Sequence, residues 1–389
     1  MKYIFIMLLP VIIMAESLDT LYEKVPTSNL YKSKIEALHA SFENKKAALY
    51  EDSWSIGGMA GYADVKDGSD AGTEYALSVG KDFNLNSSSV DALIKESGVY
   101  YNFKAQALKN RLEVKLWQLY GNYCTTMEAL QAKAELSSVY DAILTHIQKG
   151  VEYGEFDSGK AIMAKLALEN LNLQISKLEN SVQNYESQIK VIVPFDGQFE
   201  CHHIRPNLYK LFDPEYSALW PMLENKLQSS QTALRLAKLS ANSVNVNATY
   251  SNEIDTDRYM LNLSVPLNYG SKNEAKRAAA MSNAASVSYE LEALRNSYRY
   301  ESSALKSRLD IYTKYLTSTE ISIKKSADLL IKQSNMRFKA GEESFIAMLK
   351  ATETKLQMIE AILELKIDRH NAVAKYMYEY AIDPHGVSK

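Results

Sequence analysis

The stretches Val244–Tyr250 (VNVNATY) and Tyr259–Val265 (YMLNLSV) decide the fold, because every second side chain in them is apolar. Successive side chains of a β-strand point to opposite faces, so this alternation predicts strands with one apolar and one mostly polar face. A polar run around Asn252–Asp257 separates the two stretches and predicts a hairpin. Residues Trp54–Tyr62 and Tyr75–Asn84 repeat the arrangement earlier in the chain. The sequence therefore predicts two similar β-hairpins.

A long helix is predicted after each hairpin. Between Ser87 and Gly150 the chain has no proline, and apolar residues recur at steps of three and four. A stretch of the same kind runs from Ser271 to about Ala340. At 1.5 Å per residue the first helix would reach ~96 Å, too long for one globular core. A shorter helix is predicted after each long one. The first expected packing seam consists of Leu112, Leu116, Leu119, Tyr123, Met127, Leu130 and Ala134.

The joints between long and short helices match each other. Gly154 lies in the segment Tyr153–Asp157 (YGEFD), and Gly341 lies in the segment Ala340–Ser344 (AGEES). Glycine adopts positive φ easily and ends helices, while acidic residues suit the start of the next helix. Glu342 and Glu343, inside the second segment, are therefore expected to cap the following helix. Because the hairpins and joints recur at almost the same offset, the chain is predicted to be an internal duplication.

Residues 1–15 have the pattern of a signal peptide. Lys2 is basic, the residues from Tyr3 to Met14 are almost all apolar, and Ala15 is a small residue suited to cleavage. Cleavage after Ala15 and cleavage after Ser17 both fit the pattern, and an uncleaved anchor is the less favoured alternative. The apolar run is shorter than the ~20 residues of a spanning helix. The mature chain is therefore expected to be exported.

The strands are interpreted as membrane-spanning, although the same alternation also describes a half-buried strand of a soluble sheet. Export and the two long helices favour the membrane interpretation. Four strands cannot close a cylinder, and an open sheet edge is not stable in lipid, so several copies would pool their strands. The residues expected to face lipid are Trp54, Ile56, Tyr62, Leu77, Val246, Tyr250, Tyr259, Leu261 and Leu263.

Composition and motifs exclude several other function classes. A formal net charge of −3 leaves no basic excess for binding nucleic acid. The sequence contains no catalytic motif, so neither an enzyme nor a cofactor is expected. Cys201, His202 and His203 are weak candidates for a metal site, but a surface loop is the favoured interpretation of this segment. Whether Cys124 and Cys201 form a disulfide is left open.

Four segments resemble the TolC-like outer-membrane efflux proteins. They follow the order found in that family, and the resemblance covers nearly the whole mature chain. They are the two tip segments Tyr153–Lys160 and Arg337–Thr352, the strand-to-helix junction Val265–Arg277, and Asp213–Tyr216 before an amphipathic helix. No single motif is specific, but their order, duplication and spacing together are. The resemblance implies a fold that is mainly α with transmembrane β.

The resemblance also implies an assembly and a function. It implies a homotrimer whose strands form a 12-stranded β-barrel in the outer membrane of a Gram-negative bacterium, continued by a periplasmic α-helical barrel. Such a trimer is a passive exit duct of a tripartite efflux pump or a type I secretion system. Its partners are a periplasmic adaptor and an inner-membrane transporter. The alternative is an exported periplasmic coiled-coil protein, structural or adaptor-like, without a channel.

The resemblance places adaptor docking and the aperture at the periplasmic tip. The acidic residues that narrow this aperture in the family align with Ala347 and Lys350, so the usual carboxylate ring is absent there. The residues expected at the tip are Gly154, Glu155, Phe156, Asp157, Gly341, Glu342, Glu343, Ser344 and Lys350.

The expected organisation follows from these segments. The first half consists of the signal peptide (1–15), the N-terminal segment with the first ascending helix (16–52), the first β-hairpin (53–85) and the first helical hairpin (86–195), whose tip lies near 150–158. The second half consists of an equatorial linker with the second ascending helix (196–242), the second β-hairpin (243–268) and the second helical hairpin (269–383), whose tip lies near 338–344. Residues 384–389 form the C-terminal tail.

Overall fold

The computed structural model describes most of the chain after the predicted signal peptide, which lies outside the described residues. The described residues are 16–50, 53–63, 72–195, 199–202, 206–239, 241, 243–253, 256–267 and 270–388. They fall into two compact units. The first unit contains the described residues of 16–33, 107–218 and 297–388, and the second contains those of 34–106 and 219–296.

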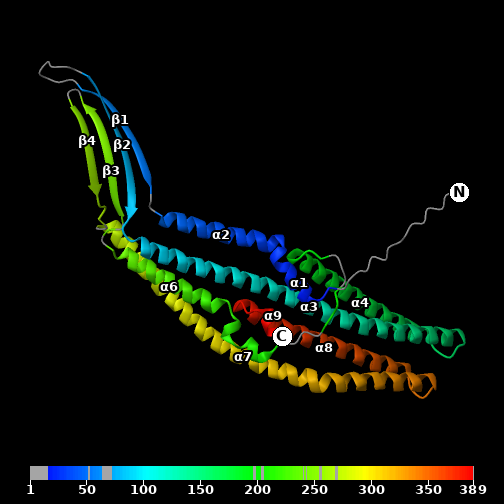
Figure 1. The fold of residues 1–389 in the computed structure, drawn as a ribbon. Helices are drawn as coiled ribbons and strands as arrows, with labels where there is room; N and C mark the ends of the chain where they lie inside the picture. Colours follow the sequence, from blue (N-terminus) through cyan, green and yellow to red (C-terminus); the bar gives the residue numbers. More distant parts are fainter. Residues whose placement is uncertain are drawn as a thin grey trace, which may run out of the picture. The chain divides into compact units, whose positions relative to one another are not determined.

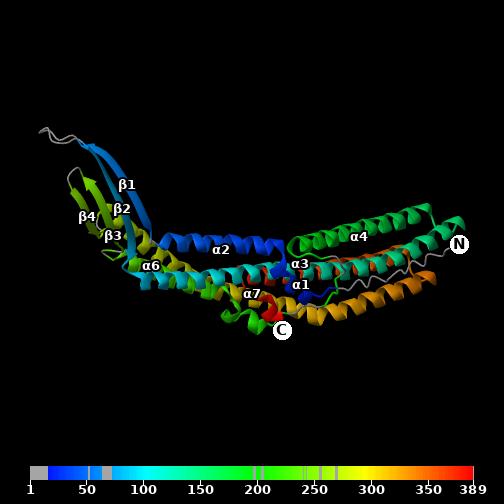
Figure 2. The same cartoon turned by 45° about the horizontal axis from the view of Figure 1, so that its top comes forward.

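The second unit contains a four-stranded antiparallel sheet in the order β1-β2-β3-β4. Figure 1 and Figure 2 both show the four strands side by side. The strands are β1 (Trp54–Ala63), β2 (Gly72–Asn84), β3 (Ser243–Glu253) and β4 (Thr256–Ser264). The two hairpins are joined by pairing of β2 with β3, in which Leu77 lies opposite Tyr250. The duplicated halves of the sequence therefore meet in one sheet.

Helices make up the rest of both units. Two long helices, α3 (Ser87–Glu152) and α7 (Ser271–Lys339), contribute residues to both units. The shorter elements are α1 (Leu18–Lys24), η1 (Val25–Thr27), α2 (Asn29–Leu49), α4 (Ser158–Ile192), α5 (Leu208–Leu211), η2 (Pro214–Tyr216), α6 (Leu219–Ala237), α8 (Phe345–Glu379) and α9 (Pro384–Ser388). The order α2-β1-β2-α3-α4 recurs as α6-β3-β4-α7-α8, and the predicted mainly helical fold with a small antiparallel sheet is confirmed. Within the described residues, no helix has an apolar stretch long enough to cross a membrane.

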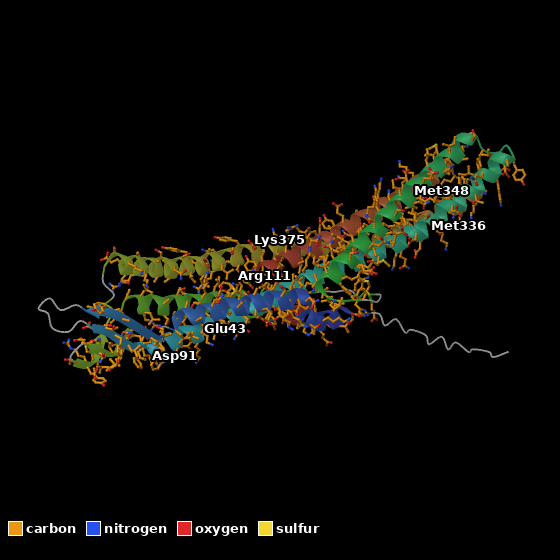
Figure 3. All side chains as sticks on the ribbon, turned by 90° about the horizontal axis from the view of Figure 1, so that it is seen from above. Glu43, Asp91, Arg111, Met336, Met348 and Lys375 are labelled. Atoms are coloured by element: carbon orange, nitrogen blue, oxygen red, sulfur yellow. A yellow bond between two sulfur atoms is a disulfide. The ribbon has the colours of Figure 1, made fainter. Side chains whose placement is uncertain are left out.

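In the first unit, side-chain contacts place four helices next to one another in the order α4, α3, α8, α7. The linking pairs are Ser137–Asn172 between α3 and α4, Gln118–Asn371 between α3 and α8, and Lys355–Asp328 between α8 and α7. Apolar side chains fill the space between the helices, and Met348 of α8 is 1% exposed whereas Met336 of α7 is 56% exposed (Figure 3). The outer helices α4 and α7 stand at the two ends of this order, although α7 also contacts α3 through the ion pair of Lys324 with Glu128 at 2.9 Å.

The buried stripe on α3 differs in part from the predicted seam. Leu116 and Leu119 are buried as expected, but Met127 and Ala134 are exposed. The buried residues of this helix within the first unit continue instead through Ala129, Leu136, Tyr140, Ile143 and Ile147. A helix that has neighbours on two sides carries more than one apolar stripe, and a single run of threes and fours follows only one of them.

The C-terminal segment is held inside the first unit. Asn110 Nδ2 of α3 donates a hydrogen bond to the carbonyl oxygen of Ala381 at 2.8 Å. Asp383 N donates to Tyr216 O at 2.9 Å, and Asn207 N donates to Val387 O at 2.9 Å. Ala381, Ile382 and Val387 are fully buried. The segment after α8 is therefore part of the core of this unit rather than a loose tail.

Candidate functional site

The strand register separates the side chains of the sheet into two contrasting faces. Directly opposite residues of an antiparallel pair lie on the same face. Trp54 pairs with Lys81, which pairs with Val246, which pairs with Leu263. By the same register, the nine residues predicted to face lipid all share one face, together with Val79, Phe83, Val244 and Ala248. The alternation in the sequence thus continues across all four strands.

The opposite face of the sheet is mostly polar, although Met59 and Met260 also lie on it. Asp82 on this face accepts hydrogen bonds from Ser53 Oγ and from Asn245 Nδ2, both at 2.8 Å. Arg258 and Glu253 form an ion pair at 3.0 Å. The other described residues of this face include Ser55, Glu74, Ser78, Asn247, Thr249, Ser251, Asn262 and Ser264. A face of this composition is suited to contact with water.

Aromatic side chains lie at the two ends of the apolar face. Tyr250 contacts Tyr75 and Tyr259, with ring centroids 6.1 Å and 5.1 Å apart. Trp54, at the start of β1, is 68% exposed. Trp54 and Tyr62 are eight residues apart on one strand, which is roughly 27 Å along it. This length is comparable with the ~25 Å apolar band of outer-membrane barrels.

The sheet has two unpaired edges. Within the described part of the chain, β1 pairs only with β2, and β4 pairs only with β3. Each edge strand therefore presents backbone N–H and C=O groups without partners in the sheet. Such an edge is a template for pairing with a strand of another chain.

Both helical tips end in the same backbone motif. Glu155 N donates to Gly150 O at 2.7 Å and Gly154 N donates to Val151 O at 3.1 Å. At the second tip the corresponding bonds run from Glu342 to Arg337 and from Gly341 to Phe338. This pair of bonds is the Schellman motif, which requires a residue in the left-handed region. Gly154 has φ 77° and Gly341 has φ 75°, as expected for glycine caps.

The helix that follows each tip is capped by a residue three positions after the glycine. Asp157 accepts a hydrogen bond from Lys160 N, and Ser344 accepts one from Ala347 N. The expectation that Glu342 and Glu343 cap α8 is therefore wrong. A short Ser or Asp side chain reaches the backbone N–H groups of the first turn from the N-cap position, and Glu342 and Glu343 precede this position.

We expect alanine at either tip glycine to destabilise its hairpin. A Cβ at Gly154 or Gly341 would meet no atom within 4 Å. The loss of stability would therefore come from backbone strain and not from a steric clash. Each change should lower the free energy of unfolding by about 1 kcal/mol, because alanine is strained at positive φ. Thermal unfolding followed by circular dichroism measures the change. The control is Asn at the same positions, which should lose less than Ala, and equal losses for Asn and Ala would contradict this explanation.

An aromatic cluster connects the two tips inside the chain, and sequence analysis missed it. The Phe156 and Phe338 rings are stacked with centroids 6.1 Å apart, and His146 lies against both at 6.1 Å and 5.5 Å. A Cβ at Gly150 would lie 2.2 Å from the Phe156 ring, so this glycine makes room for it. The one feature of the sequence that could have indicated this cluster is Gly150, a glycine inside a helical stretch. Phe156 is therefore half-buried and helps to hold the tips together.

The other predicted tip residues are mostly accessible. Glu343 is half-buried, and the remaining seven are exposed: Gly154, Glu155, Asp157, Gly341, Glu342, Ser344 and Lys350. Ala347, at the position aligned with an aperture acid, is half-buried on the first turn of α8. The tip thus presents backbone turns, three acidic side chains and one lysine to a partner.

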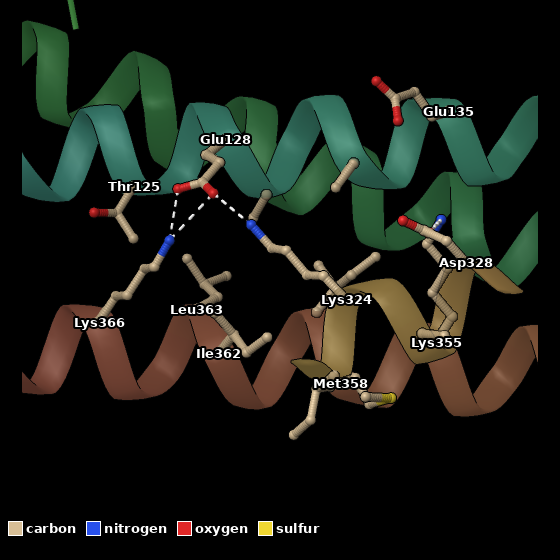
Figure 4. Close-up of a pocket in the computed structure, with 15 residues that line it drawn as sticks. Thr125, Glu128, Glu135, Lys324, Asp328, Lys355, Met358, Ile362, Leu363 and Lys366 are labelled. Carbon is tan, nitrogen blue, oxygen red and sulfur yellow. Dashed lines mark hydrogen bonds and ion pairs between the residues drawn. The ribbon is translucent and has the colours of Figure 1, made fainter. Parts of the chain in front are cut away.

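Ion pairs surround a cavity of about 210 Å³ between α3, α7 and α8 (Figure 4). Glu128 points between Lys324 and Lys366, with oxygen–nitrogen distances of 2.9 Å and 2.8 Å. Glu320 pairs with the same two lysines at 3.1 Å and 2.8 Å. Partial burial acts to raise the pKa of Glu128, but the hydrogen bonds from both lysines outweigh it and lower the pKa to about 2. Glu128 therefore stays ionised over the physiological pH range.

A buried histidine joins α8 to α3. His370 Nε2 donates to the carbonyl oxygen of Trp117 at 2.9 Å, and the two rings are stacked with centroids 3.7 Å apart. A Cβ at Gly121 would lie 2.1 Å from His370 Nε2, so a larger residue there would displace the ring. Burial lowers the pKa of His370 to about 4. The sequence pattern alone did not single out His370.

We expect His370 to make the fold acid-sensitive. Its pKa is about 4 in the folded chain and has an ordinary value of 6.5, so the unfolded chain takes up the proton first. Neutral His370 contributes about 3 kcal/mol to the free energy of unfolding. This contribution is complete above pH 6.5 and is lost as the pH falls towards 4. Denaturant unfolding at several pH values measures this loss. The His370→Gln variant should lose less stability over this range, and an equal loss would show that other groups cause it.

The two cysteines are joined. Cys124 of α3 and Cys201 form a disulfide with Cα atoms 5.4 Å apart. The Cys201 sulfur is therefore unavailable as a thiolate ligand, which corrects the weak metal candidate. His202 pairs with Glu200 at 3.2 Å, and His203 lies outside the described residues. Within the part of the chain that the structure describes, no group of three or more metal-binding side chains occurs.

Solved structures with the same fold include the outer-membrane channel CmeC, the outer-membrane protein VceC and CusC, which forms a transmembrane channel. CusC aligns with a TM-score of 0.71 at 14% identity, over 94% of this chain and 92% of CusC. VceC from Vibrio cholerae gives a TM-score of 0.72 at 11% identity, over 94% and 96% of the two chains. The CmeC channel of Campylobacter jejuni gives 0.71 at 14% identity, over 94% and 85%. No protein-family model and no curated protein sequence matches the chain. The mainly helical fold with a small antiparallel sheet that the resemblance implied is confirmed for the single chain, whereas the trimer and the 12-stranded transmembrane barrel stay predictions.

Proposed function

We propose that this chain is an outer-membrane channel that carries solutes from the periplasm to the exterior, as a passive duct and not as an enzyme. The single observation that carries the proposal is the register of the sheet, which places most of the apolar side chains of four strands on one face. A sheet that meets lipid on one side and water on the other needs this arrangement. The fold shared with CusC, VceC and CmeC supports an outer-membrane location.

The open edges of the sheet support assembly from several copies. A sheet edge in lipid leaves backbone groups unpaired, and small single-chain barrels begin at eight strands. If β4 of one copy pairs with β1 of the next, the same contact repeats around a ring. Three copies would give the 12-stranded barrel expected from the resemblance. The trimer is therefore part of the proposal.

The outer helices of the first unit support the same ring. Exposed apolar residues follow one face of α4 and one face of α7, the two helices at the ends of the order α4, α3, α8, α7. They are Ile162, Leu166 and Leu173 on α4, and Ile311, Tyr315, Leu329 and Met336 on α7, each more than half exposed. Steps of four and seven residues keep such side chains on one side of a helix. Packing of α4 from one copy against α7 of the next would bury both stripes and form a helical barrel.

We infer that the tips contact a periplasmic adaptor, which would connect the duct to an inner-membrane transporter. The support is the exposure of both tip turns and of Glu155, Asp157, Glu342 and Lys350. With Ala347 and Lys350 at the aligned aperture positions, the acidic side chains nearest the turns would supply the charge of the aperture. The cargo would then depend on the transporter that the duct serves.

Conductance tests the proposed function. Purified full-length protein in mild detergent, added to a planar lipid bilayer, is expected to give stepwise increases in ion conductance that persist after the detergent is diluted. A matched sample treated with protease before addition should give none. Protein that stays soluble without detergent and gives no conductance would contradict the duct and favour the exported coiled-coil alternative.

A further inference from the structure

We propose that Lys81 binds the phosphate of a glycerophospholipid at the helix-connected end of the sheet. This inference rests on the proposed function, because it requires the apolar face of the sheet to meet lipid. Among the described residues of that face, Lys81 is the single cation. No carboxylate in the described part of the chain forms an ion pair with Lys81.

The immediate surroundings of Lys81 hold its ammonium group at a defined place. Its Nζ lies 5.2 Å from the centroid of the Trp54 ring and 5.0 Å from that of the Phe83 ring. The Trp54 and Phe83 side chains are themselves exposed. A lysine near two aromatic rings keeps its charge attracted to their faces, and Lys81 is half-buried. The third protein neighbour across the strands is Val246, which offers no charge.

The level of Lys81 along the sheet matches a lipid headgroup. Lys81 is six residues from Tyr75 on β2, roughly 20 Å along the strand. Tyr75 belongs to the aromatic row at the opposite end of the apolar face, so Lys81 lies near the far boundary of the apolar band. At that boundary, tryptophan rings and the ends of long cationic side chains meet headgroups, while their apolar parts remain in the acyl region.

The ligand chemistry follows from the charge. An ammonium group without an acidic partner at a lipid boundary attracts a phosphate diester, and the acyl chains of the same lipid would cover Trp54, Phe83 and Val246. The site lies at the end of the sheet where α2 ends at Leu49 and α3 begins at Ser87. The lipid would therefore come from the leaflet on the side of the helical region.

Lipid titration with native mass spectrometry tests this site. The oligomer in mild detergent is titrated with phosphatidylglycerol and, separately, with diacylglycerol, which has the same acyl chains without phosphate. The wild-type protein should prefer phosphatidylglycerol, and Lys81→Met should reduce its affinity about fivefold, as expected for one lysine at an anionic surface. The Lys81→Arg variant should keep the preference, and so should Lys95→Met on α3, which removes a lysine outside the sheet.

The outcomes separate this site from the duct itself. If Lys81→Met forms the same oligomer and conducts as before but keeps the full preference for phosphatidylglycerol, the lipid site is wrong and the duct stands. If the wild-type protein neither conducts nor retains any lipid, the proposed function is wrong and the site falls with it.

Discussion

Replacing Leu261 with Arg is expected to prevent insertion of the barrel into a membrane. Leu261 is 69% exposed and lies in the alternating part Tyr259–Ser264 of β4, on the same face as Ile56 and Val79. An arginine in the middle of the lipid face should cost ~2–4 kcal/mol per chain, and a ring repeats the cost in each copy. The measurement is the fraction of protein that floats with vesicles after reconstitution.

The matched control is Asn262→Arg on the neighbouring position. Asn262 lies opposite Asn247, on the polar face of the sheet. An arginine there would meet water, so insertion should change little, and ion selectivity is the property that should respond. Equal flotation of Leu261→Arg and Asn262→Arg, including normal insertion of both variants, would contradict the assignment of the apolar face to lipid.

Loss of the disulfide is expected to give the second large effect. Cys124 and Cys201 are separated by 77 residues, and a crosslink closing a loop of this size contributes about 4 kcal/mol in the chain-entropy model. The Cys124→Ser,Cys201→Ser double variant should therefore unfold at a clearly lower denaturant concentration. The segment that carries Cys201 also holds the start of the described chain, because Glu200 N donates to Glu16 O at 3.0 Å.

Reduction provides the control for this prediction. Wild-type protein treated with a strong reductant should unfold at the same denaturant concentration as the double-serine variant, and the variant itself should not respond to the reductant. Proteolysis near Glu16 should increase in both samples, because the segment around Glu200 is released from α3. An unchanged unfolding midpoint after complete reduction would contradict a stabilising role of the disulfide.

Features set by local sequence were predictable. The alternation in Val244–Tyr250 predicted both the strand and the face of the sheet on which each residue lies. A one-residue shift of the strand register would move all of its apolar side chains to the other face. Gly154 and Gly341 marked the helix ends because few other residues tolerate positive φ. The duplication also showed that the two halves would build similar elements.

Features set by contacts between distant residues were not predictable from the sequence. His370 stacks on Trp117 over a gap of 253 positions, and no local pattern announces such a pair. Glu128 faces lysines from two other helices, so its low pKa depends on how α3, α7 and α8 pack. The capping role of Ser344 was missed because charge was given more weight than the geometry of the N-cap.

The central claim is that copies of this chain share one barrel, and the mass of the detergent-solubilised protein tests it most directly. Outer membranes are extracted with a mild detergent, and light scattering gives the protein mass after the detergent contribution is subtracted. The account predicts about three times the mass of the mature chain, with no soluble pool. A monomer or dimer that remains soluble without detergent would contradict the shared barrel and the duct with it.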